Sequence, residues 1–269
     1  MRAKPTGVQR LLQVTDTHLL ADPAAQHAGV CVEARFQATL AAMRPWAATA
    51  DALVHTGDGV HDGSVTAYRR LRAALETLGL PGRLTPGNHD DRAAMAEVFS
   101  AGLITVADSL ALGDWCVVML DTLWEGEVPG RLSAHELAGL DAALGATDAR
   151  HVLLALHHPP CPVGTVWLDA IGLLEPAALR TRLAGDSRIR GLVMGHVHQA
   201  FDGSLDGCRC LATPATAAPF LAGAETFALG EGPPGFRWLD LHSDGHIETG
   251  VEFAVMDEDN PLSSASSSL

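Results

Sequence analysis

Five short motifs in this chain carry side chains that can bind metal ions. They are Asp16-Thr17-His18, Gly57-Asp58, Gly87-Asn88-His89-Asp90, His157 and Gly195-His196-Val197-His198. Carboxylate, amide and imidazole groups are ligands for transition metals, and two such ions side by side can hydrolyse phosphoesters. Each motif alone has an ordinary structural explanation as a turn, a helix cap or a rigid loop. The full set favours a site for two metal ions.

Each motif follows directly on an apolar run that is typical of a buried strand. These runs cover residues 11–14, 52–54, 83–85, 152–156 and 191–194. Parallel strands in α/β folds bring their carboxyl ends to one edge of the sheet, where loop residues meet in a common crevice. Motifs that lie far apart in the sequence are therefore expected to assemble into one site.

Two of the motifs place a pair of ligands two residues apart. In an extended segment, side chains at positions i and i+2 point to the same side. Asp16 and His18 are therefore expected to bind one ion together, and the same alternation applies to His196 and His198. A carboxylate combined with an imidazole suits iron, manganese, zinc or cobalt.

One of the remaining ligands can connect the two ions. Asp58 follows Gly57 on a tight turn, where a carboxylate can bridge two cations about 3.5–4 Å apart, the spacing used for in-line displacement. Asn88 offers a neutral amide oxygen and His157 a further imidazole. The predicted metal ligands are Asp16, His18, Asp58, Asn88, His157, His196 and His198.

The five motifs resemble those of the calcineurin-like metallophosphoesterases, whose pattern is D-x-H, GD, GNH followed by D or E, H, and GHxH. No metal-binding letter of that pattern is substituted here. The resemblance implies an α/β fold, a four-layer α/β/β/α sandwich of two mixed sheets flanked by helices. It implies that the first metal is held by Asp16, His18, Asp58 and His198. It implies that the second metal is held by Asp58, Asn88, His157 and His196.

The resemblance also makes His89 a catalytic histidine that binds no metal. Two cations lower the pKa of a bridging water from about 15.7 toward about 7, which gives a metal-bridging hydroxide that attacks phosphorus in line. Asn88 is expected to help stabilise the phosphoryl oxygens, and His89 to protonate the leaving alkoxide. Asp90 either orients His89 or starts the following helix, and the sequence favours the helix start.

Several longer segments resemble the bacterial class III 3′,5′-cyclic nucleotide phosphodiesterase branch, over about residues 9 to 253. They are residues 11–20, 157–160, 167–169, 195–199 and 211–216. This resemblance implies hydrolysis of cyclic AMP to 5′-AMP with two divalent or trivalent ions, iron and manganese first and zinc or cobalt as alternatives. Related enzymes cleave glycerophosphodiesters or phospholipid head groups, and a non-catalytic binding scaffold is an alternative of another class.

Composition limits the partners. The chain has 269 residues, 18 basic and 32 acidic, with a formal net charge of −14. This charge argues against electrostatic binding to a nucleic acid polymer or an anionic membrane. It leaves a small-molecule phosphodiester as the expected substrate. A monomer and a homodimer are both compatible with the sequence.

The expected compartment is the cytoplasm. The chain has five cysteines without the spacing of a disulfide framework, which fits a reducing environment. The N-terminus lacks the apolar core of a signal peptide, and no run approaches the ~18 apolar residues of a membrane span.

Strand and helix patterns alternate along the chain up to Val197, which predicts a largely parallel sheet. Expected strands are 9–14, 51–55, 82–86, 103–106, 115–120, 151–156 and 189–194. Expected helices are 32–48 with a stop around Pro45, 64–78, 90–98, 133–144 with a Ser133–Glu136 capping box, and 175–184. Antiparallel strands are expected at 198–204, 208–213, 225–229, 236–242 and 246–253. Residues 1–255 are predicted to form a single domain, and 256–269 a disordered tail.

Three features stay open at this level. Trp167, in the loop from Cys161 to Leu174, could form a wall for a nucleotide base or pack as core. His61 and Asp62 lie close to Asp58 and could support a metal ligand or form a solvated turn.

The third feature is a possible structural zinc site formed by His196, His198, Cys208 and Cys210. It would leave Asp16 without a role, so the two cysteines are better interpreted as buried apolar residues.

Overall fold

Two six-stranded mixed sheets form the centre of the computed structural model, which describes residues 3–256. The first sheet has the order β16-β15-β1-β4-β5-β6. Its strands are β1 (Gln9–Val14), β4 (Ala52–Thr56), β5 (Gly82–Thr85), β6 (Ile104–Thr105), β15 (Gly235–Leu241) and β16 (Ile247–Phe253). The second sheet has the order β13-β14-β12-β10-β8-β7. Its strands are β7 (Ser109–Leu112), β8 (Trp115–Met119), β10 (His151–Leu156), β12 (Ile189–Met194), β13 (Phe201–Leu205) and β14 (Cys208–Ala212).

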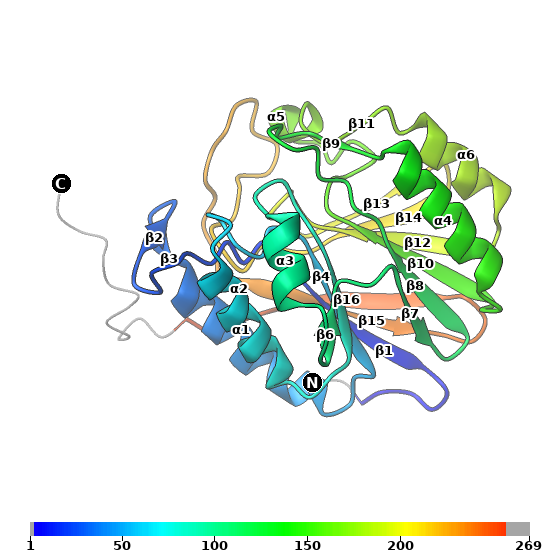
Figure 1. The fold of residues 1–269 in the computed structure, drawn as a ribbon, viewed down its shortest axis with the longest axis horizontal. Helices are drawn as coiled ribbons and strands as arrows, with labels where there is room; N and C mark the ends of the chain where they lie inside the picture. Colours follow the sequence, from blue (N-terminus) through cyan, green and yellow to red (C-terminus); the bar gives the residue numbers. More distant parts are fainter. Residues whose placement is uncertain (1–2, 257–269) are drawn as a thin grey trace.

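Helices cover the outer face of each sheet. The first sheet packs against α1 (Val32–Ala47), α2 (Val65–Glu76) and α3 (Arg92–Val98) in one apolar core. The second packs against α4 (Ala134–Ala146), α5 (Val166–Asp169) and α6 (Ala177–Gly185) in another. Figure 1 shows α1 and α2 on one side of the sheets and α4 and α6 on the other.

A third apolar core joins the two sheets face to face. It contains side chains from both sheets, among them Leu11 and Val54 from the first and Val117, Leu153 and Val193 from the second. The predicted four-layer α/β/β/α sandwich of two mixed sheets is therefore confirmed. That residues 1–255 form one domain stays a prediction, and the predicted tail lies outside the described residues after Met256.

The central strands are parallel and buried on both faces. β4 is buried at all five positions and β10 at all six, as expected for continuous apolar runs in parallel strands. In the first sheet β1, β4 and β5 run parallel, and in the second β10 and β12 do. All five motifs therefore follow the carboxyl ends of parallel strands, as predicted.

Two small sheets lie outside this frame. They pair β2 (Gln26–His27) with β3 (Val30–Cys31), and β9 (Gly130–Arg131) with β11 (Leu173–Leu174). Within residues 3–256, no helix is long and apolar enough to cross a membrane.

The second half of the chain departs from the expected pattern in two places. The strand predicted at 225–229 is wrong, because that segment is a loop with a single bridge from Leu229 to Phe220. A short alternating run forms a strand only where a sheet edge is free to pair with it. β14 pairs in parallel with β12 and antiparallel with β13, so the C-terminal strands are not all antiparallel. β7 was not predicted.

The end of one helix and the cap of another also differ from expectation. Helix α1 continues past Pro45 to Ala47, although proline has no N–H group to donate to the carbonyl four residues earlier. Ser133 caps α4 by accepting the Glu136 N–H at 3.1 Å. The Glu136 carboxylate instead accepts the N–H of Asp121, so the predicted capping box is only half formed.

Candidate metal centre

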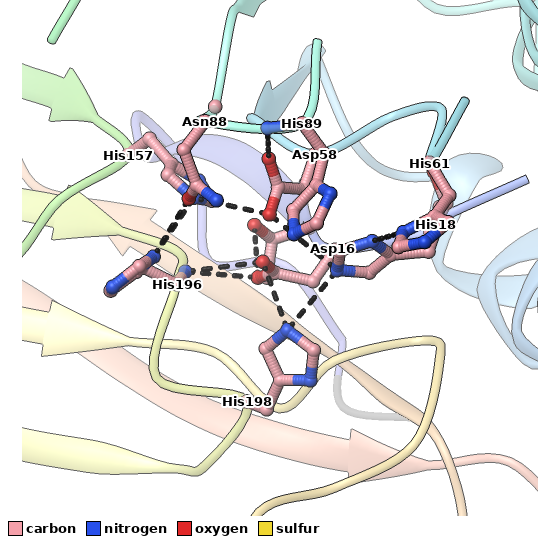
Figure 2. A network of polar contacts seen from close by, with 12 residues as sticks. Asp16, His18, Asp58, His61, Asn88, His89, His157, His196 and His198 are labelled. Carbon is pink, nitrogen blue, oxygen red and sulfur yellow. Dashed lines mark hydrogen bonds and ion pairs between the residues drawn. The ribbon is translucent and has the colours of Figure 1, made fainter. Parts of the chain in front are cut away.

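Asp58 lies at the centre of the predicted ligands. Its Oδ2 atom is 3.5 Å from His18 Nε2 on one side and 3.4 Å from His157 Nε2 on the other. Its Oδ1 atom accepts a hydrogen bond from the backbone N–H of His89 at 2.9 Å. Figure 2 shows the ligand side chains converging around this carboxylate. Asp58 thus lies between the two groups of predicted ligands, and its role as a bridge stays a prediction.

The first half of the site consists of Asp16, His18 and His198. His198 Nε2 is 3.3 Å from Asp16 Oδ1 and 3.3 Å from His18 Nε2. His198 Nδ1 donates to the carbonyl of Ala218 at 2.7 Å, so its Nε2 atom presents a lone pair to the other two ligands. These three residues can hold one metal ion.

The second half consists of Asn88, His157 and His196. Asn88 Oδ1 is 3.2 Å from His157 Nε2 and 3.1 Å from His196 Nδ1, and the two nitrogens are 3.3 Å apart. His157 Nδ1 donates to the carbonyl of Thr56 at 2.8 Å, so the neutral form of the ring has its lone pair on Nε2.

The donor set fits cations. His198 in the first half and His157 in the second each use Nδ1 to donate to a main-chain carbonyl. In the neutral ring, Nε2 then turns its lone pair toward carboxylate or amide oxygens. Lone pairs placed this close repel one another unless a positive charge lies between them. Imidazole, carboxylate and amide ligands suit first-row transition metals. The arrangement can therefore hold two ions, one in each half, that share Asp58.

Charges in the site also favour cations. Burial raises the pKa of Asp16, but the neighbouring His198 lowers it to about 2. Burial likewise opposes ionisation of Asp58, and His157 holds the pKa of that carboxyl well below its usual range. The Asp58 carboxylate in turn overrides burial and raises the pKa of His157 to about 9. Two buried anions thus attract positive charge, which metal ions supply in place of protons.

The backbone of the ligand motifs is unusual. Positive φ angles occur at Asp16 (53°), His18 (45°), Asp58 (53°), His196 (70°) and His198 (53°). Non-glycine residues rarely adopt this conformation, which costs about 1–3 kcal/mol each and clusters at functional sites. The backbone N–H groups of Asp16 and His18 donate to Gly57 and Asp58 carbonyls, which holds the first motif against the second.

These angles correct the reason given for the ligand pairs. Asp16 and His18 do face the same half of the site, but through left-handed residues and not through the alternation of an extended strand. His196 and His198 face different halves, so the alternation argument is wrong for them.

Two motif glycines make room for ligands of other motifs. A Cβ atom on Gly87 would lie 2.2 Å from Asp58 Oδ1, and one on Gly57 would lie 2.4 Å from His157 Nδ1. Gly57 also has a φ of +96°, which favours glycine. The glycines thus precede ligands in the sequence because other ligands pack against their backbone.

Asp90 does not start the following helix, as the sequence had favoured. Helix α3 is capped by Asp91, whose carboxylate accepts the N–H of Ala94 at 2.8 Å. Asp90 is buried and accepts hydrogen bonds from the Gly87, Gly59 and Val60 N–H groups and the Tyr68 hydroxyl. It therefore fastens the Asp58 loop to the loop of Asn88 and His89.

A cavity of about 230 Å³ opens over the ligands. One wall is aromatic, with the Trp167 ring 5.0 Å from Phe220 and 5.3 Å from Phe227 between centroids. Trp167 thus lines the cavity and also packs against the core of the second sheet, and its role as a wall for a base stays a prediction. The opposite side carries His89, which is exposed, and His27.

Sequence reasoning missed part of this cavity. Phe227 lies in the segment wrongly predicted as a strand and Phe220 lies before it, and no pattern in the sequence marks either as a cavity residue. His27 looked like an ordinary surface residue. The nearest available signal was the aromatic content of residues 220–227 after a predicted ligand loop.

The alternative zinc site is not formed. Cys208 and Cys210 lie on β14, and no group of potential metal ligands within residues 3–256 includes a cysteine. Both thiols have raised pKa values, Cys208 to about 11 because of burial, and such thiols are poor ligands.

Comparisons with known proteins agree with this geometry. The chain is 36% identical over 241 residues to the 3′,5′-cyclic adenosine monophosphate phosphodiesterase CpdA of Pseudomonas aeruginosa, covering 90% of this chain and 88% of that protein. It is 37% identical to the CpdA of Escherichia coli, with 90% of this chain and 88% of that protein covered.

Among solved structures, a dimetal phosphatase from Danio rerio shares the fold with a TM-score of 0.64 and 15% identity, over 93% of this chain and 100% of that one. The calcineurin-like phosphoesterase family pattern matches residues 9–200, from the first motif through the last. The chain therefore belongs to the calcineurin-like phosphoesterase family.

Proposed function

We propose that this protein hydrolyses 3′,5′-cyclic AMP to 5′-AMP at a binuclear metal centre. The observation that carries the proposal is the meeting of two ligand sets at Asp58 Oδ2, below a cavity with an aromatic wall. The printed names of the CpdA relatives, similar over 90% of the chain, support cyclic AMP as the substrate.

The proposed ligands divide between the two ions as the halves of the site do. Asp16, His18 and His198 would hold the first ion, Asn88, His157 and His196 the second, and Asp58 both. When bound, two such ions activate water as a nucleophile and stabilise negative charge on phosphoryl oxygens. The mixed oxygen and nitrogen ligands favour iron or manganese, with zinc or cobalt as alternatives.

His89 is suited to protonate the leaving group. Its ring is exposed at the rim, 4.9 Å from the His18 ring, and its backbone N–H donates to Asp58 Oδ1. That bond fixes the main chain of His89 relative to the bridging carboxylate, while the ring stays free to reach the substrate. A positioned general acid contributes about 10²–10⁴-fold to the rate.

The aromatic wall is suited to the base. Base–aromatic stacking is worth about 1–3 kcal/mol, and Trp167, Phe220 and Phe227 present rings in the same cavity as the ligands.

A substrate panel tests the proposal. One manganese-loaded preparation would be assayed with cyclic AMP, cyclic GMP, 2′,3′-cyclic AMP, glycerophosphocholine and a phosphomonoester. We expect the highest kcat/KM for cyclic AMP. If the 3′,5′-cyclic nucleotides were the poorest substrates, the assignment of substrate would be wrong while the metal chemistry could stand. No turnover of any ester, with two ions bound, would favour a binding scaffold.

A further inference from the structure

His18 has a second ring nitrogen that the ligand set does not use. Its Nε2 atom faces Asp58 and His198 in the first half of the site. A neutral imidazole that coordinates through Nε2 must carry its proton on Nδ1. Ligand histidines usually give this proton to a carboxylate, a carbonyl or water, and the bond fixes both tautomer and ring orientation.

Here the group that faces this proton is another histidine. His61 Nδ1 lies 3.3 Å from His18 Nδ1. In the opposite half, the corresponding outer nitrogen of His157 meets a main-chain carbonyl, that of Thr56. The outer nitrogen of His198 likewise meets the Ala218 carbonyl. His18 thus differs from both in being backed by a side chain, which substitution can remove.

The backbone around His61 holds it in place. Its N–H donates to the Leu19 carbonyl at 2.9 Å, one residue beyond His18. On the other side, the Asp62 carboxylate accepts the N–H groups of Ala21 and Ser64 and closes the turn. The segment that carries His61 is therefore fastened to the segment that carries His18.

The ring of His61 is confined as well. It lies between His27, at 3.9 Å between centroids, and His89, at 4.6 Å. Figure 2 shows His61 beside His18, on the side away from the other ligands. A ring held on both faces keeps its in-plane nitrogen directed at one partner.

We propose that His61 is a positioning residue for the first metal. It accepts a hydrogen bond from His18 Nδ1–H, and so fixes the tautomer and orientation in which His18 Nε2 binds the ion. The inference rests on the proposed ligand assignment of His18. It does not depend on cyclic AMP being the substrate.

The test measures metal affinity of the otherwise intact protein. Metal-free wild type, His61→Ala and His61→Asn would be titrated with Mn²⁺ against a chelator, with bound ions counted by mass spectrometry. Asparagine places an acceptor oxygen where His61 has Nδ1. We expect His61→Ala to weaken the first ion by about 10–100-fold, and His61→Asn to stay within about threefold of wild type. The second ion should be unaffected by either change.

Two further variants separate this role from general packing. His135→Ala removes an exposed histidine on α4 and should bind the first ion like wild type. His27→Ala removes one of the two rings that confine His61 but leaves its Nδ1 atom, so it should weaken the first ion less than His61→Ala does. Circular dichroism and melting of the metal-free variants would confirm that each is folded.

The outcomes are separable from those of the ligand assignment. His18→Ala should lose the first ion, and if it did not, the assignment of His18 would fail. If His18→Ala lost the ion but His61→Ala bound it normally, only the present inference would be overturned. Equal weakness of His61→Ala and His61→Asn would also overturn it. The inference would also be overturned if wild type bound a third ion that His61→Ala lost, because His18 Nδ1 would then be a metal ligand.

Discussion

The two halves of the metal centre are supported in different ways. In the second half, His157 is 0% exposed and its outer nitrogen meets a carbonyl at the end of β4. In the first half, His198 also meets a main-chain carbonyl, but His18 is backed by His61, and further histidines at the rim surround it. His157 is thus held by the main chain of the sheet, whereas His18 depends on a side chain of a loop. Substitutions outside the ligands should therefore affect the first half more.

The strongest way to break this comparison is to remove the residue that both halves share. Asp58→Asn replaces the bridging anion by a neutral amide, so both halves lose the negative charge that attracts the two metal ions. We expect loss of both ions and hydrolysis at background level, measured by metal analysis and by cyclic AMP turnover. The exposed Asp148→Asn is the matched control and should behave as wild type. Retention of two ions by Asp58→Asn would contradict the bridging role.

The next largest effect should come from a residue that serves both halves without belonging to either. His89→Ala should keep both ions, because His89 is a ligand of neither in the proposed assignment, and lower cyclic AMP turnover by about 10²–10⁴-fold. The loss should be much smaller for bis-p-nitrophenyl phosphate, whose leaving group needs no proton. Metal analysis beside kcat for the two substrates checks this. Loss of an ion in His89→Ala would show that His89 is a ligand.

The sequence predicted the features that depend on local patterns and missed those that depend on contacts between distant segments. The ligand motifs and their strands were predictable, because apolar runs buried on both faces and polar residues at their ends are local patterns. The left-handed backbone of Asp16 and His18 was not, since it depends on hydrogen bonds between distant loops. The role of Asp90 was hidden for the same reason. Its four donors come from three separate segments.

The cavity wall shows a second limit. Phe227 lies in a loop that has the alternating pattern of a strand, and only the tertiary structure decides that no sheet edge is available. His61 was left open between a supporting role and a solvated turn, because its proximity to His18 arises from the β-bridge between Leu19 and Val60. Contacts between segments remote in sequence therefore account for most of what was missed.

A smaller effect should come from the aromatic wall, which lies outside both halves. Trp167→Ala removes one ring from the cavity, and the loss of stacking, about 1–3 kcal/mol, should raise KM for cyclic AMP by roughly tenfold with kcat little changed. Trp167→Phe should lie between the two. Bis-p-nitrophenyl phosphate provides the control substrate, because it lacks a purine base. An equal effect on both substrates would argue against a base site at Trp167.

The smallest expected effect is a difference between the halves in the pH dependence of their metal affinity. In the metal-free protein burial opposes protonation of His157, but the Asp58 carboxylate raises its pKa to about 9, so the ring is protonated at pH 7. It must release that proton to become a ligand. Affinity for the second ion should therefore rise by up to about tenfold per pH unit below pH 9 and level off above it.

The first half should respond less to pH. Burial lowers the pKa of His18 well below its usual value, so this ring is already neutral and has no proton to release. His18→Ala leaves the second half alone and His157→Ala leaves the first, so manganese titrations of the two variants from pH 6 to 9 give each slope. Calorimetry in two buffers would count the protons released. If metal affinity rose with pH equally in the two variants, Asp58 would act on His18 and His157 alike. The two halves would then differ in the groups that hold their ligands but not in their electrostatics.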